Sequence, residues 1–90
     1  MNWKEFTEAT TGMDSDYQLA IKIQGAIKWI TQVEVKADQV LFSTDAGEPL
    51  TLGPVLLEAF DANQQVLIQE DGIMQLVFGY HIQGETLVLG

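Results

Sequence analysis

The sequence contains no cysteine and no arginine, and each absence removes a class of chemistry. Without cysteine, the chain has no disulfide framework, thiol nucleophile or thiolate metal ligand. Without arginine, it lacks the side chain that grips phosphate groups and guanine bases through two parallel hydrogen bonds. A chain without disulfides suits a reducing compartment, so we expect a cytoplasmic protein.

Positive charge is confined to the first 36 residues, where all four lysines lie. From Ala37 onward there is no cation, whereas eight acidic side chains follow, and the net charge of the chain is -9. Such a surface repels phosphate, which argues strongly against direct binding to nucleic acids or to anionic membranes. The same charge favours a basic protein as partner, because opposite charges speed the encounter.

Long apolar runs are also missing. No wholly apolar run exceeds four residues, far below the roughly 20 that span a bilayer, and the N-terminal sequence MNWKEFTEATTG does not read as a secretory signal. A hydrophobic content of 47% is ample for one core, whereas 90 residues are too few for two, because each half would be near the size that needs disulfides or metals to fold. We therefore expect a soluble single domain over residues 1–90.

The N-terminal residues carry agreeing signals for a short helix over residues 3–10. Asn2 is placed to cap its first turn, and Glu5, three positions later, completes the pattern of a capping box. Gly12 stands just beyond its end, where glycine is common. These signals are local and depend on no distant contact.

The stretch 15–31 fits two templates. Alternating apolar side chains up to Val35, many of them β-branched, are typical of strands, and Gly25 would interrupt a helix. A helical stripe is the alternative, formed by Leu19, Ile23, Ala26, Ile27 and Ile30. We favour the strands and keep the helix as the alternative.

The rest of the chain alternates short apolar stretches with turn residues. Pro54 suits a first helical turn, which predicts a short helical insertion near 54–60. The dipeptide Asp71-Gly72 predicts a hairpin whose second strand runs over 73–83, and 86–89 form a last strand. The fold class is therefore α+β: a short N-terminal helix followed by a curved, mainly antiparallel sheet of five to seven short strands.

Two segments, 35–42 and 82–89, share one order of apolar, small and acidic positions. Any tight turn between two buried strands favours that order. We therefore interpret the similarity as a shared requirement of two turns and not as gene duplication.

No motif for metal, nucleophilic or phosphate chemistry is complete. The stretch from Asp61 begins like a calcium loop but lacks the glycine and glutamate that such a loop needs at its sixth and twelfth positions. Neither Ser15 nor Ser43 stands in a nucleophile elbow. His81, the only histidine, falls on the more polar face of its predicted strand, so we interpret it as solvent-facing. We expect no catalytic residue, no metal site and no cofactor.

Taken together, the sequence favours a small acidic, non-catalytic domain that binds a protein partner in an accessory or regulatory role. One alternative is a homo-oligomeric structural or accessory component, for example of a phage or bacterial assembly, that pairs through exposed strands such as the uncharged 86–89. A nucleic-acid mimic is less favoured, because carboxylates in turns are sparser than the phosphates of duplex DNA. The candidate partner-binding residues are Trp3, Asp38, Asp45, Glu48, Glu70, Asp71, His81 and Glu85.

Overall fold

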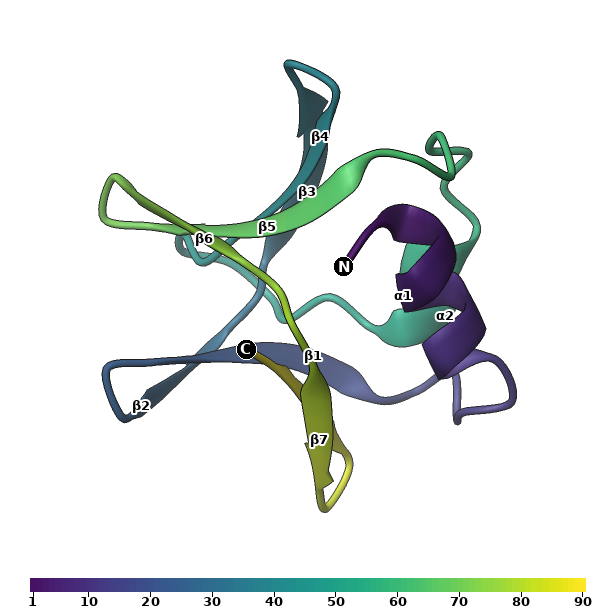
Figure 1. The fold of residues 1–90 in the computed structure, drawn as a ribbon. Coiled ribbons are helices and arrows are strands. Elements are labelled where there is room, and N and C mark those ends of the chain that lie inside the picture. The colour runs from purple at the N-terminus through teal and green to yellow at the C-terminus, as the bar shows by residue number, and fades with distance from the viewer.

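Two helices and eight strands make up the fold in a computed structural model that describes residues 1–90 (Figure 1). The helices are α1 (Trp3–Thr10) and α2 (Leu52–Leu56). The strands are β1 (Gln18–Ile23), β2 (Ala26–Trp29), β3 (Gln32–Lys36), β4 (Gln39–Ser43), β5 (Gln65–Glu70), β6 (Ile73–Leu76), β7 (Tyr80–Gln83) and β8 (Thr86–Leu89). The predicted α+β class is confirmed, although the eight strands exceed the five to seven that the sequence suggested. Neither helix is long and apolar enough to cross a membrane.

The strands form two four-stranded sheets of the same design. One has the order β2-β1-β8-β7 and the other the order β3-β4-β5-β6. In each sheet the two central strands are parallel, and each outer strand joins a central one in an antiparallel hairpin. The turns of the β1-β2 and β5-β6 hairpins project to the same side, whereas those of the β3-β4 and β7-β8 hairpins point in opposite directions (Figure 1). Most pairs are antiparallel, as predicted, but the parallel central pairs and the division into two sheets were not foreseen.

A structural repeat relates the two halves of the chain. Gln18 begins β1, and Gln65, 47 positions later, begins β5; the same shift carries β2, β3 and β4 onto β6, β7 and β8. The turn between β1 and β2 has φ angles of 50° and 81°, and the turn between β5 and β6 has 50° and 78°. The similarity between 35–42 and 82–89 is thus one part of a repeat that covers all eight strands, not a property of two turns alone.

Each helix packs against the other half of the repeat. The N–H of Trp3, at the start of α1, donates to the carbonyl of Gln64 (2.8 Å), and the N–H of Leu52, at the start of α2, donates to the carbonyl of Tyr17 (2.9 Å). Isolated bridges join residues 2 and 65, and 51 and 18, in the same exchanged manner. The two halves are therefore interlocked.

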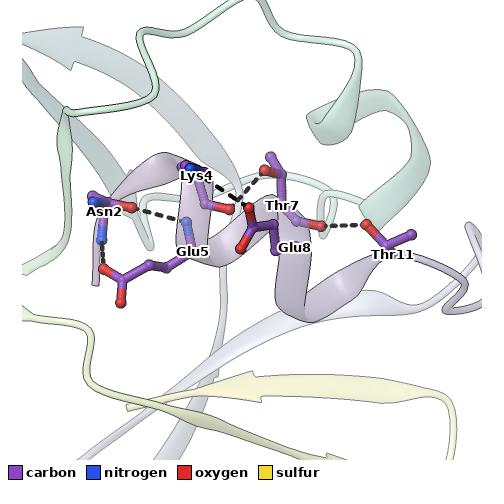
Figure 2. A network of polar contacts seen from close by, with 6 residues as sticks. All are labelled: Asn2, Lys4, Glu5, Thr7, Glu8 and Thr11. Atoms are coloured by element: carbon purple, nitrogen blue, oxygen red, sulfur yellow. Dashed lines mark hydrogen bonds and ion pairs between the residues drawn. The ribbon is translucent and has the colours of Figure 1, made fainter.

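The predicted helix over residues 3–10 is confirmed with those bounds. The side chain of Asn2 accepts a hydrogen bond from the N–H of Glu5, and the Glu5 carboxylate accepts one from the N–H of Asn2 (Figure 2). Along the same helix, Lys4 and Glu8 form an exposed ion pair of 4.0 Å, and the hydroxyl of Thr11 donates to the carbonyl of Thr7. The capping box thus fixes where the helix begins.

The second helix lies earlier than predicted, over Leu52–Leu56 instead of 54–60. Leu52 and Val55 are buried and anchor it to the core, whereas Leu57, directly after it, is 86% exposed. Because only one side of this short segment can reach the core, the helix centres on the buried residues and not on the stretch that Pro54 suggested.

The ambiguous stretch 15–31 forms strands and not a helix, which is the alternative that the sequence favoured. The alternation does not mark one long strand, however, because it is broken at Ile30, which is fully buried where the chain passes from the first sheet to the second. Val77 is equally buried and divides the predicted strand 73–83 into β6 and β7, which belong to different sheets. At each break the chain passes from one sheet to the other, so two consecutive strands belong to different sheets around a shared core.

Candidate protein-binding surface

The outer strands of both sheets are exposed along most of their length. Every residue of β2, β6 and β7 is exposed, whereas the central strands β1, β4, β5 and β8 are mostly buried. All but one of the large exposed hydrophobic side chains lie on these edge strands or between them, at Ile27, Trp29, Val35, Ile73, Met74, Leu76, Phe78, Tyr80 and Ile82; Leu57 is the exception. The fold thus places apolar side chains at sheet edges, where another chain can pair.

One continuous stretch carries most of them, and we call residues 73–83 the edge segment. Its sequence, IMQLVFGYHIQ, contains no charged side chain in a protein of net charge -9. The equivalent stretch of the first half, 26–36, reads AIKWITQVEVK and carries Lys28, Glu34 and Lys36. Charged side chains are a common protection of exposed sheet edges. The first half therefore has this protection and the second half lacks it.

The apolar area of the edge segment is large for a protein of this size. Six of its side chains, those of Ile73, Met74, Leu76, Phe78, Tyr80 and Ile82, are between 39% and 79% exposed. They present on the order of 600 Å² in total, divided between different faces of the molecule: Ile73 lines one hollow with Ile23, and Met74 lines another with Leu41. Each partner in a standard protein interface contributes about 800 Å², so the apolar side chains on one face of the edge segment supply part of one.

The backbone of β7 also offers unpaired hydrogen-bonding groups. The N–H of Gly90 donates to the carbonyl of Gly79 (3.1 Å), so Gly79 faces β8. Because backbone groups alternate in direction along a strand, Tyr80 and Ile82 direct their N–H and C=O groups away from β8, to the open edge of the sheet. The Tyr80 hydroxyl donates to the carbonyl of Ala9 (3.4 Å), which links this strand to α1. The edge is therefore held in place before any partner arrives.

His81 lies on the opposite face of β7 from the side chains of Tyr80 and Ile82, and it is exposed, as the alternation predicted. Its neighbour across the sheet is Val88, which is buried. His81 therefore sits beside the open edge, within the edge segment.

Glu70 is not a free surface acid. Its carboxylate accepts a hydrogen bond from the Lys28 ammonium, with an Nζ–Oε1 distance of 2.6 Å, and another from the Thr44 hydroxyl, and the residue is buried. The hydrogen bond and the charge of Glu70 raise the pKa of Lys28 above the usual 10.5. The pair links β2 of the first sheet to β5 of the second, so Glu70 has a structural role.

The other acidic candidates do not form one patch. Asp45 and Asp71 line the same polar hollow, on the outer face of the sheet β3-β4-β5-β6. Asp38 and Glu85 occupy the turns of two hairpins that point away from each other (Figure 1), and Glu48 is exposed in the loop before α2. Of these five acids the structure therefore brings together only Asp45 and Asp71, and Asp71 also lines a second hollow with Glu70.

Trp3 is buried in the core, with 4% of its surface exposed. Its ring stacks on Phe6 at 5.2 Å and meets Phe60 edge-on at 4.9 Å. Its ring is therefore packed inside the molecule and does not form part of the exposed surface.

The last strand is also not the exposed edge that its uncharged sequence suggested. β8 lies between β1 and β7, and Leu87, Val88 and Leu89 are fully buried. Parallel pairing with β1 covers the side that was expected to be open. The uncharged edge is the neighbouring strand, β7. The sequence did hold a signal for it, a run of 11 residues without charge in an acidic chain.

The fold and the edge segment can be set beside known proteins. Protein-family models, curated proteins and solved structures were compared with the chain, and none of them matches it. Its function is therefore inferred from its own surface.

Proposed function

We propose that this protein is a non-catalytic domain that binds another protein through the edge segment, in an accessory or regulatory role. The observation that supports this most is the presence of six exposed apolar side chains on residues 73–83, a stretch without charge that forms an open edge of each sheet, β6 in one and β7 in the other. Exposed apolar surface of this extent is typical of interaction sites.

Both elements of a binding edge are present together. Apolar side chains supply the area that association removes from water, and the free backbone groups of Tyr80 and Ile82 can extend the sheet into a strand of the partner. Because β7 is already ordered by β8 and by the contact of Tyr80 with α1, little conformational entropy is lost on binding.

The negative charge of the chain favours some partners over others. The acids Asp71 and Glu85 stand just outside the two ends of the edge segment, and the whole chain is acidic. Charges around an apolar centre set specificity and the rate of encounter more than affinity. Acidic surfaces and nucleic acids are repelled by these groups unless salt screens them.

Phe78 and Leu57 offer a matched pair of variants to test this function. Both are large apolar side chains in irregular segments and are 79% and 86% exposed, but only Phe78 belongs to the edge segment. Tagged wild-type protein, Phe78→Asp and Leu57→Asp would be used to capture proteins from a lysate of the producing organism, with thermal unfolding to verify that each variant is folded. We expect a protein retained by wild type and by Leu57→Asp but lost with Phe78→Asp. Equal retention by all three baits, or by none, would count against the edge segment as the binding site.

A further inference from the structure

We propose that the edge segment binds a second copy of this chain, with the two β7 strands antiparallel, so that two sheets join into one of eight strands. This inference rests on the proposed function, because it names the partner of the same surface. It takes the form of a symmetric dimer in which both copies use the same residues.

The backbone of β7 selects the register of this pairing. Only Tyr80 and Ile82 direct their N–H and C=O groups to the open edge, so these are the residues that can exchange hydrogen bonds with a new strand. In an antiparallel pair of two identical strands, both outward residues of each copy exchange hydrogen bonds only when Tyr80 of one copy faces Ile82 of the other. His81 then lies on the two-fold axis, opposite His81 of the second copy.

The same register keeps the acidic groups of the two copies apart. Gln83, the last residue of β7, is two residues from His81, which is about 7 Å of strand, and Glu85 lies beyond it in the turn to β8, so the two Glu85 residues stand at least about 13 Å apart on opposite sides of the axis. This exceeds the Debye length of about 8 Å at physiological ionic strength, so their repulsion is largely screened. A pair of chains that each carry a net charge of -9 can therefore meet here with little local repulsion.

The two open edges of the first half, β2 and β3, are less suited to a second copy. On β2, Lys28 is held by Glu70, and on β3, Glu34 and Lys36 place charges along the edge. Charges directed at a pairing edge oppose the approach of another strand. β6, which precedes β7 in the edge segment, is uncharged as well. Phe78, between these two strands, is 79% exposed and adds apolar contact beside the pairing strands.

Sedimentation velocity of the purified protein tests the inference directly. From about 10 μM to about 1 mM, we expect a reversible shift from monomer to dimer. Added salt should increase the dimer fraction, because it screens the repulsion between two acidic chains. Binding of a basic partner would respond to salt in the opposite direction, so a decrease in self-association with salt would contradict the proposed contact.

Ile82 and Val35 provide the matched variants. They occupy equivalent positions of the repeat, on β7 and β3, and are 42% and 45% exposed. Ile82→Lys places like charges close to the two-fold axis and should raise the dimer dissociation constant by about tenfold or more, whereas Val35→Lys should change it by less than about twofold. Thermal unfolding of both variants identifies any loss of folding. If Ile82→Lys does not fold, Phe78→Asp compared with Leu57→Asp serves in its place.

The possible failures are distinguishable. A wild-type protein that stays monomeric at every concentration and salt, or equal effects of Ile82→Lys and Val35→Lys, would overturn pairing with a second copy. The proposed function would survive that result if Phe78→Asp still abolished the capture of another protein. A dimer disrupted by Ile82→Lys alone would support the inference whatever the capture experiment yields.

Discussion

Ile30 and Val77 lie 47 positions apart and occupy the same place in the two halves of the fold. Both are fully buried; the N–H of Ile30 donates to the carbonyl of Leu19 (2.9 Å), and that of Val77 donates to the carbonyl of Val66 (3.1 Å). At each of them the chain leaves one sheet and enters the other. These two residues therefore join the sheets at equivalent points of the core.

Truncation of either residue should be strongly destabilising. Ile30→Ala removes three carbons from a packed interior, and we expect the free energy of unfolding to fall by about 3 kcal/mol; for the smaller Val77→Ala we expect about 2 kcal/mol. Urea denaturation measures both. Ile27→Ala, at an exposed position three residues before Ile30, should change stability by less than about 0.5 kcal/mol. Similar losses at Ile27 and Ile30 would contradict the special place of Ile30.

The N-caps of the two helices should differ in importance. Asn2 caps α1 through its side chain, whereas Thr51, which precedes α2, makes no such hydrogen bond. Asn2→Ala should therefore lower the free energy of unfolding by about 1 kcal/mol, and Thr51→Ala by only a few tenths. Chemical denaturation of the two variants side by side is sufficient. An equal cost at both positions would show that the capping box contributes little.

The turns at Ala37 and Gly84 should respond to opposite substitutions. Both residues have positive φ angles, 51° and 59°, and they are equivalent in the repeat. A side chain costs about 1 kcal/mol in this conformation, which glycine adopts freely. Ala37→Gly should therefore raise the melting temperature and Gly84→Ala should lower it, as differential scanning calorimetry can measure. Destabilisation by both changes would mean that backbone strain does not govern these turns.

The pair of Lys28 and Glu70 predicts a pH dependence. Because the pKa of Lys28 is raised in the folded protein, its contribution to stability is fully present below the unfolded value, near 10.5, and is lost as pH rises through the folded value. Lys28→Met should lower the melting temperature at neutral pH, and the difference from wild type should shrink above pH 10.5. Lys22→Met removes a lysine that forms no ion pair and should show no such trend. A difference that is constant with pH would contradict this role.

Local features of the fold could be predicted from the sequence, because their causes lie within a few residues. The capping box of Asn2 and Glu5 defines the first helix, and Asp71-Gly72 defines a hairpin turn. The crossings at Ile30 and Val77 could not be predicted, because a buried apolar residue continues the alternation whether the chain stays in one sheet or enters another. The parallel pairing of Gln18 with Thr86 joins residues too distant for any pattern to show.

The candidate site was predicted less well than the fold. Acidic side chains were expected to mark the surface, but Glu70 is buried in an ion pair and Trp3 is part of the core. The charge-free run 73–83 was visible in the sequence, yet its meaning depends on β7 being an edge strand and β8 a central one. That order is set by long-range pairing, so the wrong strand was identified as the open edge.

The pairing of β1 with β8 has a consequence for the order of events during synthesis. β1 begins at Gln18, but its parallel neighbour is complete only when Leu89 has been made, so the first sheet cannot close while the ribosome is still adding the second half. Such distant pairing slows folding and leaves apolar strands uncovered for longer. Until β8 has been made, β1 and β2 can form no more than a hairpin, and their apolar side chains stay open to unwanted contacts.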